Sequence, residues 1–232
     1  MMNYNLGRIA ITGDTHGNGF KRIKDAKKLG IHTLIVCGDF GYIWSNIKEN
    51  KYNIKVINDI GIKILFLDGN HENFDELKKY PYNNMFEGKV QIISNNIIHL
   101  LRGETYRIND KNIFVMGGAA STDKDCRIEG KSWWKEEVPD ELERENALNN
   151  LKKLNFNVDI VLSHTAPSTI LKAMNAEYRC DEFTEFLEWI NINVNFDCWY
   201  FGHMHTDSKI DDKHICVYKD IVNFNNSDNY CI

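Results

Sequence analysis

Short apolar segments that alternate with amphipathic ones limit most strongly how this 232-residue chain can fold. Residues 8–12, 32–37 and 62–67 have the apolar pattern of buried strands, and residues 20–29 and 53–60 between them have helical spacing of apolar side chains. Strands that alternate with helices form parallel β-α-β units. Because ligands of such sheets gather at the carboxyl ends of the strands, a functional site is expected among the residues that follow each strand.

The pattern changes after residue 90. Closely spaced strand candidates lie at residues 91–93, 97–101, 105–108 and 112–116. They predict a meander and therefore a mixed sheet. A polar segment without periodicity follows, and the chain is expected to form a single domain over residues 1–232 with an elaborated loop at about 119–139.

The last third of the chain returns to alternation. The predicted elements are a helix at about 139–154, strands at 159–162 and 198–201, a packing helix at 182–192, and a closing hairpin of residues 215–218 and 221–224.

Seven residues that can bind a metal come just after the predicted strands. They are Asp14, His16, Asp39, Asn70, His164, His203 and His205. Each short motif alone is common in turns, but all of them occur in one chain at strand ends. Mixed carboxylate, amide and imidazole ligands suit manganese first, with iron, zinc, nickel or cobalt as alternatives. One shared carboxylate would let these ligands hold two divalent or trivalent ions, and two metals roughly 3.5–4 Å apart can clamp both oxygens of a phosphoryl transfer.

Two further side chains are candidates for chemistry. His71 follows Asn70 directly and could protonate a leaving alkoxide, or it could only orient a neighbour. Arg127, in the elaborated loop, could hold a phosphate oxygen, or it could be solvated. The adjacent Trp133 and Trp134 could stack a base or sugar, but such a pair also commonly attaches a loop to its own domain.

The succession Asp-x-His, Gly-Asp, Gly-Asn-His-Glu, lone His and Gly-His-x-His resembles the calcineurin-like metallophosphoesterase superfamily. The resemblance implies an α/β fold, a four-layer αββα sandwich with two mixed β-sheets flanked by helices. It also implies a dinuclear metal centre and a general acid. On matching positions, Asp14, His16 and His205 would hold one metal, Asn70, His164 and His203 the second, Asp39 would bridge them, and His71 would be the acid.

The chain departs from this family at one position. The family often has a second Asp three residues after the bridging one, and here that position is Tyr42. The second Asp can support the catalytic histidine. Glu72 or Asp75 could replace it, or His71 could lack such support.

The sequence therefore predicts a dinuclear metal-dependent phosphoesterase that hydrolyses phosphomonoesters or phosphodiesters by in-line attack of a metal-bridging hydroxide. His71, Asp39 and Asn70 would be catalytic, and Arg127 and Asn70 would contact the substrate. A phosphorylated small molecule, a nucleotide or a phosphopeptide would fit as substrate. The alternative is a non-catalytic metal-binding scaffold, or a partner-recruiting protein on the same fold.

Composition narrows the partners and the location. A formal net charge of -5 gives no support for binding long nucleic acid. No apolar run reaches spanning length, so no membrane helix is expected. The six cysteines are scattered without a close pair, which favours free thiols and a cytoplasmic location. The sequence leaves the oligomeric state open.

Overall fold

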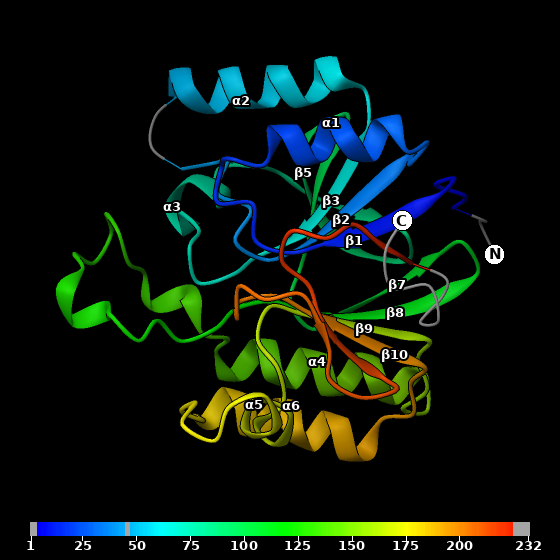
Figure 1. The fold of residues 1–232 in the computed structure, drawn as a ribbon, viewed down its shortest axis with the longest axis vertical. Coiled ribbons are helices and arrows are strands. Elements are labelled where there is room, and N and C mark those ends of the chain that lie inside the picture. Colours follow the sequence, from blue (N-terminus) through cyan, green and yellow to red (C-terminus); the bar gives the residue numbers. More distant parts are fainter. Residues whose placement is uncertain (1–3, 45–46, 225–232) are drawn as a thin grey trace.

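Two mixed β-sheets face each other in the computed structural model, which describes residues 4–44 and 47–224 (Figure 1). The first sheet has the order β13-β1-β2-β3-β6-β5-β4. Its strands are β1 Ile9–Thr12, β2 Thr33–Cys37, β3 Lys63–Leu67, β4 Tyr82–Met85, β5 Gly88–Ser94, β6 Ile97–Leu100 and β13 Val222–Asn223. The four strands from β1 to β6 are parallel neighbours, and β13, β5 and β4 pair antiparallel at the two edges.

The second sheet has the order β11-β12-β10-β9-β8-β7. Its strands are β7 Glu104–Ile108, β8 Lys111–Met116, β9 Ile160–Ser163, β10 Cys198–Phe201, β11 Ser208–Lys209 and β12 His214–Cys216. The strands from β12 to β8 are parallel neighbours, while β11 and β7 are antiparallel edges. Both sheets are therefore mixed.

Helices cover the outer face of each sheet (Figure 1). α1 Phe20–Lys28 and α2 Ile47–Ile60 lie on the first sheet, and α4 Glu141–Lys153, α5 Ser168–Met174 and α6 Glu182–Asn193 lie on the second. The short α3 Phe74–Leu77 follows β3 near one end of the sandwich. The four-layer αββα sandwich predicted from the sequence is confirmed.

The apolar runs form strands because both faces of each sheet are buried. In β1, Ile9 and Ile11 point into the layer between the sheets, whereas Ala10 points toward α1 and α2. In β9, Leu162 faces the layer between the sheets and Val161 faces the helices below. This two-residue alternation with apolar side chains on both sides is typical of parallel strands covered by helices.

The predicted strands and helices are present, and the structure adds four elements that the sequence pattern does not predict, which are α3, β4, α5 and β11. In addition, α2 begins at Ile47 rather than at residue 53. β4 is polar and mostly exposed, and α3 has only four residues, so neither has an apolar period that could identify it.

The predicted closing hairpin is wrong. β12 pairs with β10 in the second sheet, whereas β13 pairs antiparallel with β1 in the first sheet. The carboxylate of Asp207 accepts hydrogen bonds from the backbone N–H groups of Tyr218, Lys219 and Asp220, at 2.6–3.1 Å. These bonds hold the connecting segment in a path that leads from one sheet to the other.

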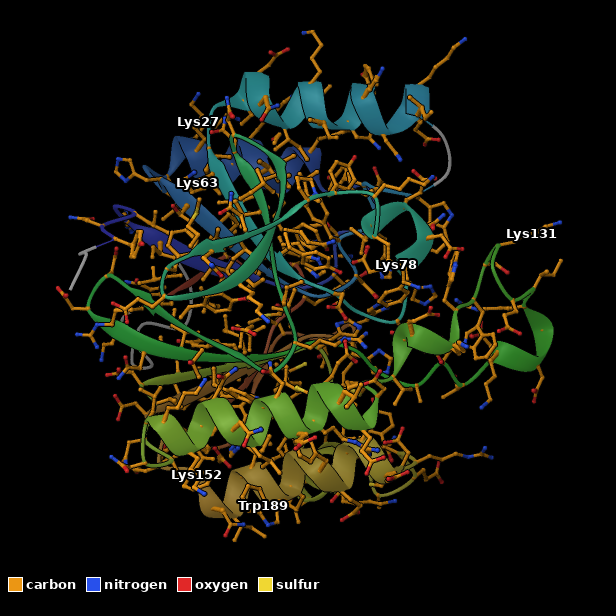
Figure 2. All side chains as sticks on the ribbon, turned by 180° about the vertical axis from the view of Figure 1, so that it is seen from behind. Lys27, Lys63, Lys78, Lys131, Lys152 and Trp189 are labelled. Carbon is orange, nitrogen blue, oxygen red and sulfur yellow. The ribbon has the colours of Figure 1, made fainter. Side chains whose placement is uncertain are left out.

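The elaborated loop forms a segment that projects from one end of the sandwich and contains two short 3-10 helices, Lys124–Cys126 and Lys135–Glu137 (Figure 1). Trp134 is buried, and its ring N–H donates to Asp75 at 2.9 Å. Lys78 forms an ion pair with Glu136 and lies beside the base of the segment, whereas Lys131 lies at its outer end (Figure 2). Trp134 thus attaches the segment to its own domain.

The free thiols expected from the sequence are found in the described residues, where five cysteines are free, and Cys231 lies outside the described residues. No helix in residues 4–44 or 47–224 is long and apolar enough to cross a membrane.

A buried ion pair joins Asp68, which follows β3, to Arg102, which follows β6. The Nε of Arg102 donates to Asp68 at 2.6 Å, and His99 lies 3.1 Å from the same carboxylate. Burial alone would raise the pKa of Asp68, but Arg102 and His99 outweigh it and lower the pKa from 3.8 to about 2. The carboxylate is therefore charged and paired at neutral pH.

We predict that Arg102→Met destabilises the fold by about 3–5 kcal/mol at pH 7, because it leaves the Asp68 charge buried without its partner. The difference in the free energy of unfolding between wild type and Arg102→Met should be largest above pH 4. It should shrink as the pH falls from 3.8 towards the lowered Asp68 pKa of about 2. Urea unfolding at several pH values measures this difference. Asp68→Asn combined with Arg102→Met should recover part of the loss, and a single variant as stable as wild type would contradict the prediction.

Candidate metal centre

The seven expected ligands meet at one end of the sandwich because they follow strands that end there. In the first sheet, β1 is followed by Asp14 and His16, β2 by Asp39 and β3 by Asn70. In the second sheet, β9 is followed by His164, and β10 by His203 and His205. The strands of each group are parallel neighbours, so their carboxyl ends lie side by side.

One group of ligands surrounds His16. The ligand atoms of Asp14, His16, Asp39 and His205 all lie within 4.8 Å of one another. The Nε2 atoms of His16 and His205 are 3.0 Å apart, and the Nε2 of His16 lies 3.6 Å from Oδ2 of Asp39. The structure therefore brings together an Asp and His cluster that could hold a metal ion.

A second group surrounds His164. Its Nε2 lies 3.1 Å from Oδ1 of Asn70 and 3.3 Å from Oδ1 of Asp39. The rings of His164 and His203 have centroids 4.9 Å apart. Asp39 thus has one carboxylate oxygen toward each group.

Asp39 provides the test of whether these residues fit a metal. Its Oδ2 atom is buried and has no hydrogen-bond partner within the described part of the chain. An unpaired buried carboxylate oxygen is unfavourable unless a cation or donor reaches it. The neighbouring donors are imidazole nitrogen and carboxylate oxygen, which are metal ligands. The residues therefore fit a bound cation.

The tautomer of His164 also suits metal binding. Its Nδ1 lies 2.9 Å from the backbone oxygen of Cys37, so Nδ1 carries the proton and Nε2 faces the cluster. A carbonyl that fixes the far ring nitrogen in this way is typical of metal-binding histidines.

Burial and mutual charge shift the pKa values of the expected ligands. Burial raises the pKa of Asp14, and repulsion from Asp39 helps to bring it to about 7 despite attraction to His164. Burial lowers the pKa of His164, but Asp39 outweighs it and raises that pKa to about 9. Burial lowers the pKa of His16 to about 4 and that of His203 to about 3. Because ligands bind metals in deprotonated form, metal uptake should release protons from Asp14 and His164.

Asn70 is oriented by two residues that the sequence did not single out. Ser121 donates its hydroxyl to Glu137 at 2.6 Å and accepts from the Nδ2 of Asn70 at 3.0 Å. The amide oxygen of Asn70 is therefore the atom that faces His164. Ser121 belongs to the projecting segment, and a contact across 51 positions leaves no signal in the sequence.

Four of the expected ligands have an unusual backbone conformation. His16, Asp39, His203 and His205 have φ between 45° and 66°, in the left-handed region. Non-glycine residues adopt it rarely, and such strain clusters at functional sites. Two hydrogen bonds stabilise this conformation at Asp39, because its backbone oxygen accepts from the N–H groups of Thr15 and His16.

Two glycines are required by close packing around these ligands. A Cβ atom at Gly38 would lie 2.0 Å from Nδ1 of His164, and one at Gly69 would lie 2.1 Å from Oδ1 of Asp39. Any larger residue at either position would displace an expected ligand.

His71 and Arg127 lie together beside the cluster. The backbone N–H of His71 donates to Oδ1 of Asp39 at 2.7 Å, and its ring lies 5.3 Å from that of His16. Two guanidinium nitrogens of Arg127 lie 2.9 and 3.2 Å from the ring nitrogens of His71, and Asp123 pairs with the same guanidinium at 2.8 Å. Burial, aided by Arg127, lowers the pKa of His71 below its usual value.

Neither carboxylate considered as a support for His71 bonds to its ring. Glu72 accepts from the backbone N–H groups of Phe40 and Gly41, at 2.6 and 3.3 Å. Asp75 accepts from Trp134. The hydroxyl of Tyr42 accepts from the N–H of Gly19 at 2.6 Å. The side chain that hydrogen-bonds to the His71 ring is instead Arg127, from the projecting segment.

Comparison with known proteins identifies the family of this chain. The chain matches the calcineurin-like phosphoesterase family over residues 7–207, which include all seven expected ligands, and it belongs to this family of metal-dependent enzymes. Its fold is similar to that of the protein TT1561 of Thermus thermophilus, with a TM-score of 0.58 and 9% identity over 94% of each chain. This likeness shows the fold alone. A search of curated proteins found no match.

We predict that Asp39→Ala lowers the bound metal content at both groups of ligands, because Asp39 has an oxygen toward each. His16→Ala should weaken mainly the group that contains it. Elemental analysis of purified variants measures the metal content. Asp59→Ala removes an exposed carboxylate on α2 and should leave the content unchanged. Near-normal content of two metals in Asp39→Ala would exclude the bridging role.

Proposed function

We propose that this protein hydrolyses phosphate esters with two metal ions held by the seven-residue cluster. The position of Asp39 is the observation that supports this most strongly. Its carboxylate lies 3.6 Å from His16 on one side and 3.3 Å from His164 on the other. A shared carboxylate is suited to a pair of metals roughly 3.5–4 Å apart.

Each ion would have its own protein ligands. One ion would be held by Asp14, His16 and His205. The other would be held by Asn70, His164 and His203, and Asp39 would bind both ions. When bound, the ions would lower the pKa of water and stabilise negative charge on the phosphate. Manganese is our first choice because the ligands are mixed oxygen and nitrogen donors.

His71 would serve as the general acid. Its backbone is fixed by Asp39 and its ring lies beside that of His16, so a leaving oxygen at the cluster is close to the imidazole. A protonated histidine whose pKa is below its usual value is a stronger proton donor than an ordinary histidine. The required form is the protonated one, so its contribution falls as the pH rises through the His71 pKa.

Arg127 would bind a phosphate oxygen. Its side chain is only 17% exposed, and its guanidinium contacts the ring of His71, which supports this role. Asp123 pairs with one end of the guanidinium, which restricts the rotation of the side chain. A planar fork of donors held in this way suits phosphate.

Turnover of 4-nitrophenyl phosphate and bis(4-nitrophenyl) phosphate by manganese-loaded protein tests the proposal. Wild type should hydrolyse at least one ester, and Asp39→Ala neither. A non-catalytic scaffold would bind metal without turnover of any phosphate ester. The next comparison of substrates should include a phosphorylated small molecule, a nucleotide and a phosphopeptide. We also expect the protein to act in the cytoplasm.

We predict that His71→Ala keeps its metals but loses rate on alkyl esters by roughly 10²–10⁴-fold, the usual effect of a lost acid. The loss should be smaller with a nitrophenolate leaving group, which needs little protonation. The alkaline fall in rate on alkyl esters should also disappear in the variant. Equal losses on both kinds of ester would indicate that His71 only positions its neighbours.

We predict that Arg127→Ala lowers kcat/KM by a larger factor than it raises KM, because its contact strengthens as charge develops in the transition state. Arg127→Lys should restore little, since an ammonium lacks the planar fork. Metal content should not change. Arg144, which pairs with Glu182 on the outer helices, is the matched control and Arg144→Ala should keep full activity. Full activity of Arg127→Ala would contradict the proposal that Arg127 binds a phosphate oxygen.

A further inference from the structure

Two hollows open on different sides of the cluster of expected metal ligands. The Tyr178 hollow, of about 470 Å³, is lined by Tyr178, His203 and His205 among others. The Trp44 hollow, of about 310 Å³, is lined by Trp44, His16 and His71 among others. Their walls meet where His16 and His205 approach to 3.0 Å. Each volume falls within the roughly 300–1,000 Å³ of ordinary ligand pockets.

The Trp44 hollow is suited to a flat, uncharged group. The Trp44 ring is half-buried and is held edge-on by Trp134, with centroids 5.6 Å apart. Asn53 donates its amide N–H to the backbone oxygen of Tyr42 at 3.1 Å, which leaves its carbonyl oxygen as an acceptor. Glu49 adds a carboxylate to the lining. An aromatic face with the Asn53 carbonyl oxygen beside it favours a ring that carries N–H or hydroxyl donors.

The Tyr178 hollow has the same character. Tyr178 is half-buried, and the hydroxyl-bearing Thr122 and Thr165 lie in the same lining. Arg179 is the basic residue of the lining apart from the histidines, and the carboxylates of Glu177 and Asp181 outnumber it. A second phosphate group would meet repulsion here, whereas an uncharged group with a ring and hydroxyls would not.

We propose, on the basis of the function proposed above, that the substrate is a phosphodiester with two uncharged, ring-bearing arms, the chemistry of a dinucleoside monophosphate. His71 lines the Trp44 hollow, so the leaving arm occupies that hollow and the retained arm occupies the Tyr178 hollow. The bond from phosphorus to the leaving oxygen breaks and a bond from phosphorus to a water oxygen forms. The leaving oxygen takes a proton from His71, which regains one from the water. The products are one alcohol and one phosphomonoester.

Kinetics of the manganese-loaded protein test this assignment. The substrates are adenylyl-(3′,5′)-adenosine as diester and 4-nitrophenyl phosphate as monoester. Tyr178→Ala should lower kcat/KM for the diester about tenfold, the scale of one lost base-stacking contact, and should affect the monoester much less. Tyr178→Phe keeps the ring and should keep most of the diester rate. Tyr52, an exposed tyrosine on α2 outside both hollows, gives the matched control Tyr52→Ala.

A binding measurement complements the rates. Adenosine, which has no phosphate, should inhibit diester hydrolysis by wild type and inhibit Tyr178→Ala about tenfold less strongly. Equal effects of Tyr178→Ala on both esters, or a wild type that prefers the monoester, would overturn the assignment of the hollows. A wild type that binds two metals but hydrolyses no phosphate ester would instead overturn the proposed function, and this inference with it.

Discussion

The bonds made by Asp39 are the interaction on which the site depends. Its backbone oxygen accepts from the N–H groups of Thr15 and His16, which ties the loop after β2 to the loop after β1. Its Oδ1 accepts from the N–H of His71, which ties in the loop after β3. The residue does this with φ of 49°, and its remaining oxygen has no partner in the described chain. One strained residue therefore positions three loops and presents a carboxylate oxygen to the cluster, an arrangement typical of functional sites.

The second sheet joins the same network through backbone groups. The N–H of His203 donates to Asp14 at 3.1 Å, and His164 donates to the backbone oxygen of Cys37. The two sheets are therefore connected by polar bonds at this end as well as by the apolar layer between them. Substitutions that shift one sheet relative to the other should disturb the ligands even when they lie far from them, because the ligands come from both sheets.

The projecting segment completes the site from outside the sandwich. Ser121 and Glu137 orient Asn70, Arg127 contacts His71, and Trp134 anchors the segment on Asp75. The Trp residue that could have stacked a substrate is thus used for packing, while the half-buried rings of Trp44 and Tyr178 line the hollows beside the cluster. The segment therefore supports both the expected ligand Asn70 and the proposed acid, which gives a long insertion a role in a compact fold.

The sequence by itself determined most strands and helices and indicated the candidate ligands, while the family resemblance implied the four layers. Consecutive apolar residues such as Ile9, Ala10 and Ile11 indicate a strand covered on both faces, and each candidate ligand follows such a strand, so local pattern was sufficient. Only the tertiary structure decided which sheet β12 and β13 join, because strands of two or three residues contain no register information. It also decided the contacts of Ser121, Glu72 and Tyr42, since hydrogen bonds between residues far apart in the chain depend on how the loops pack and not on local sequence.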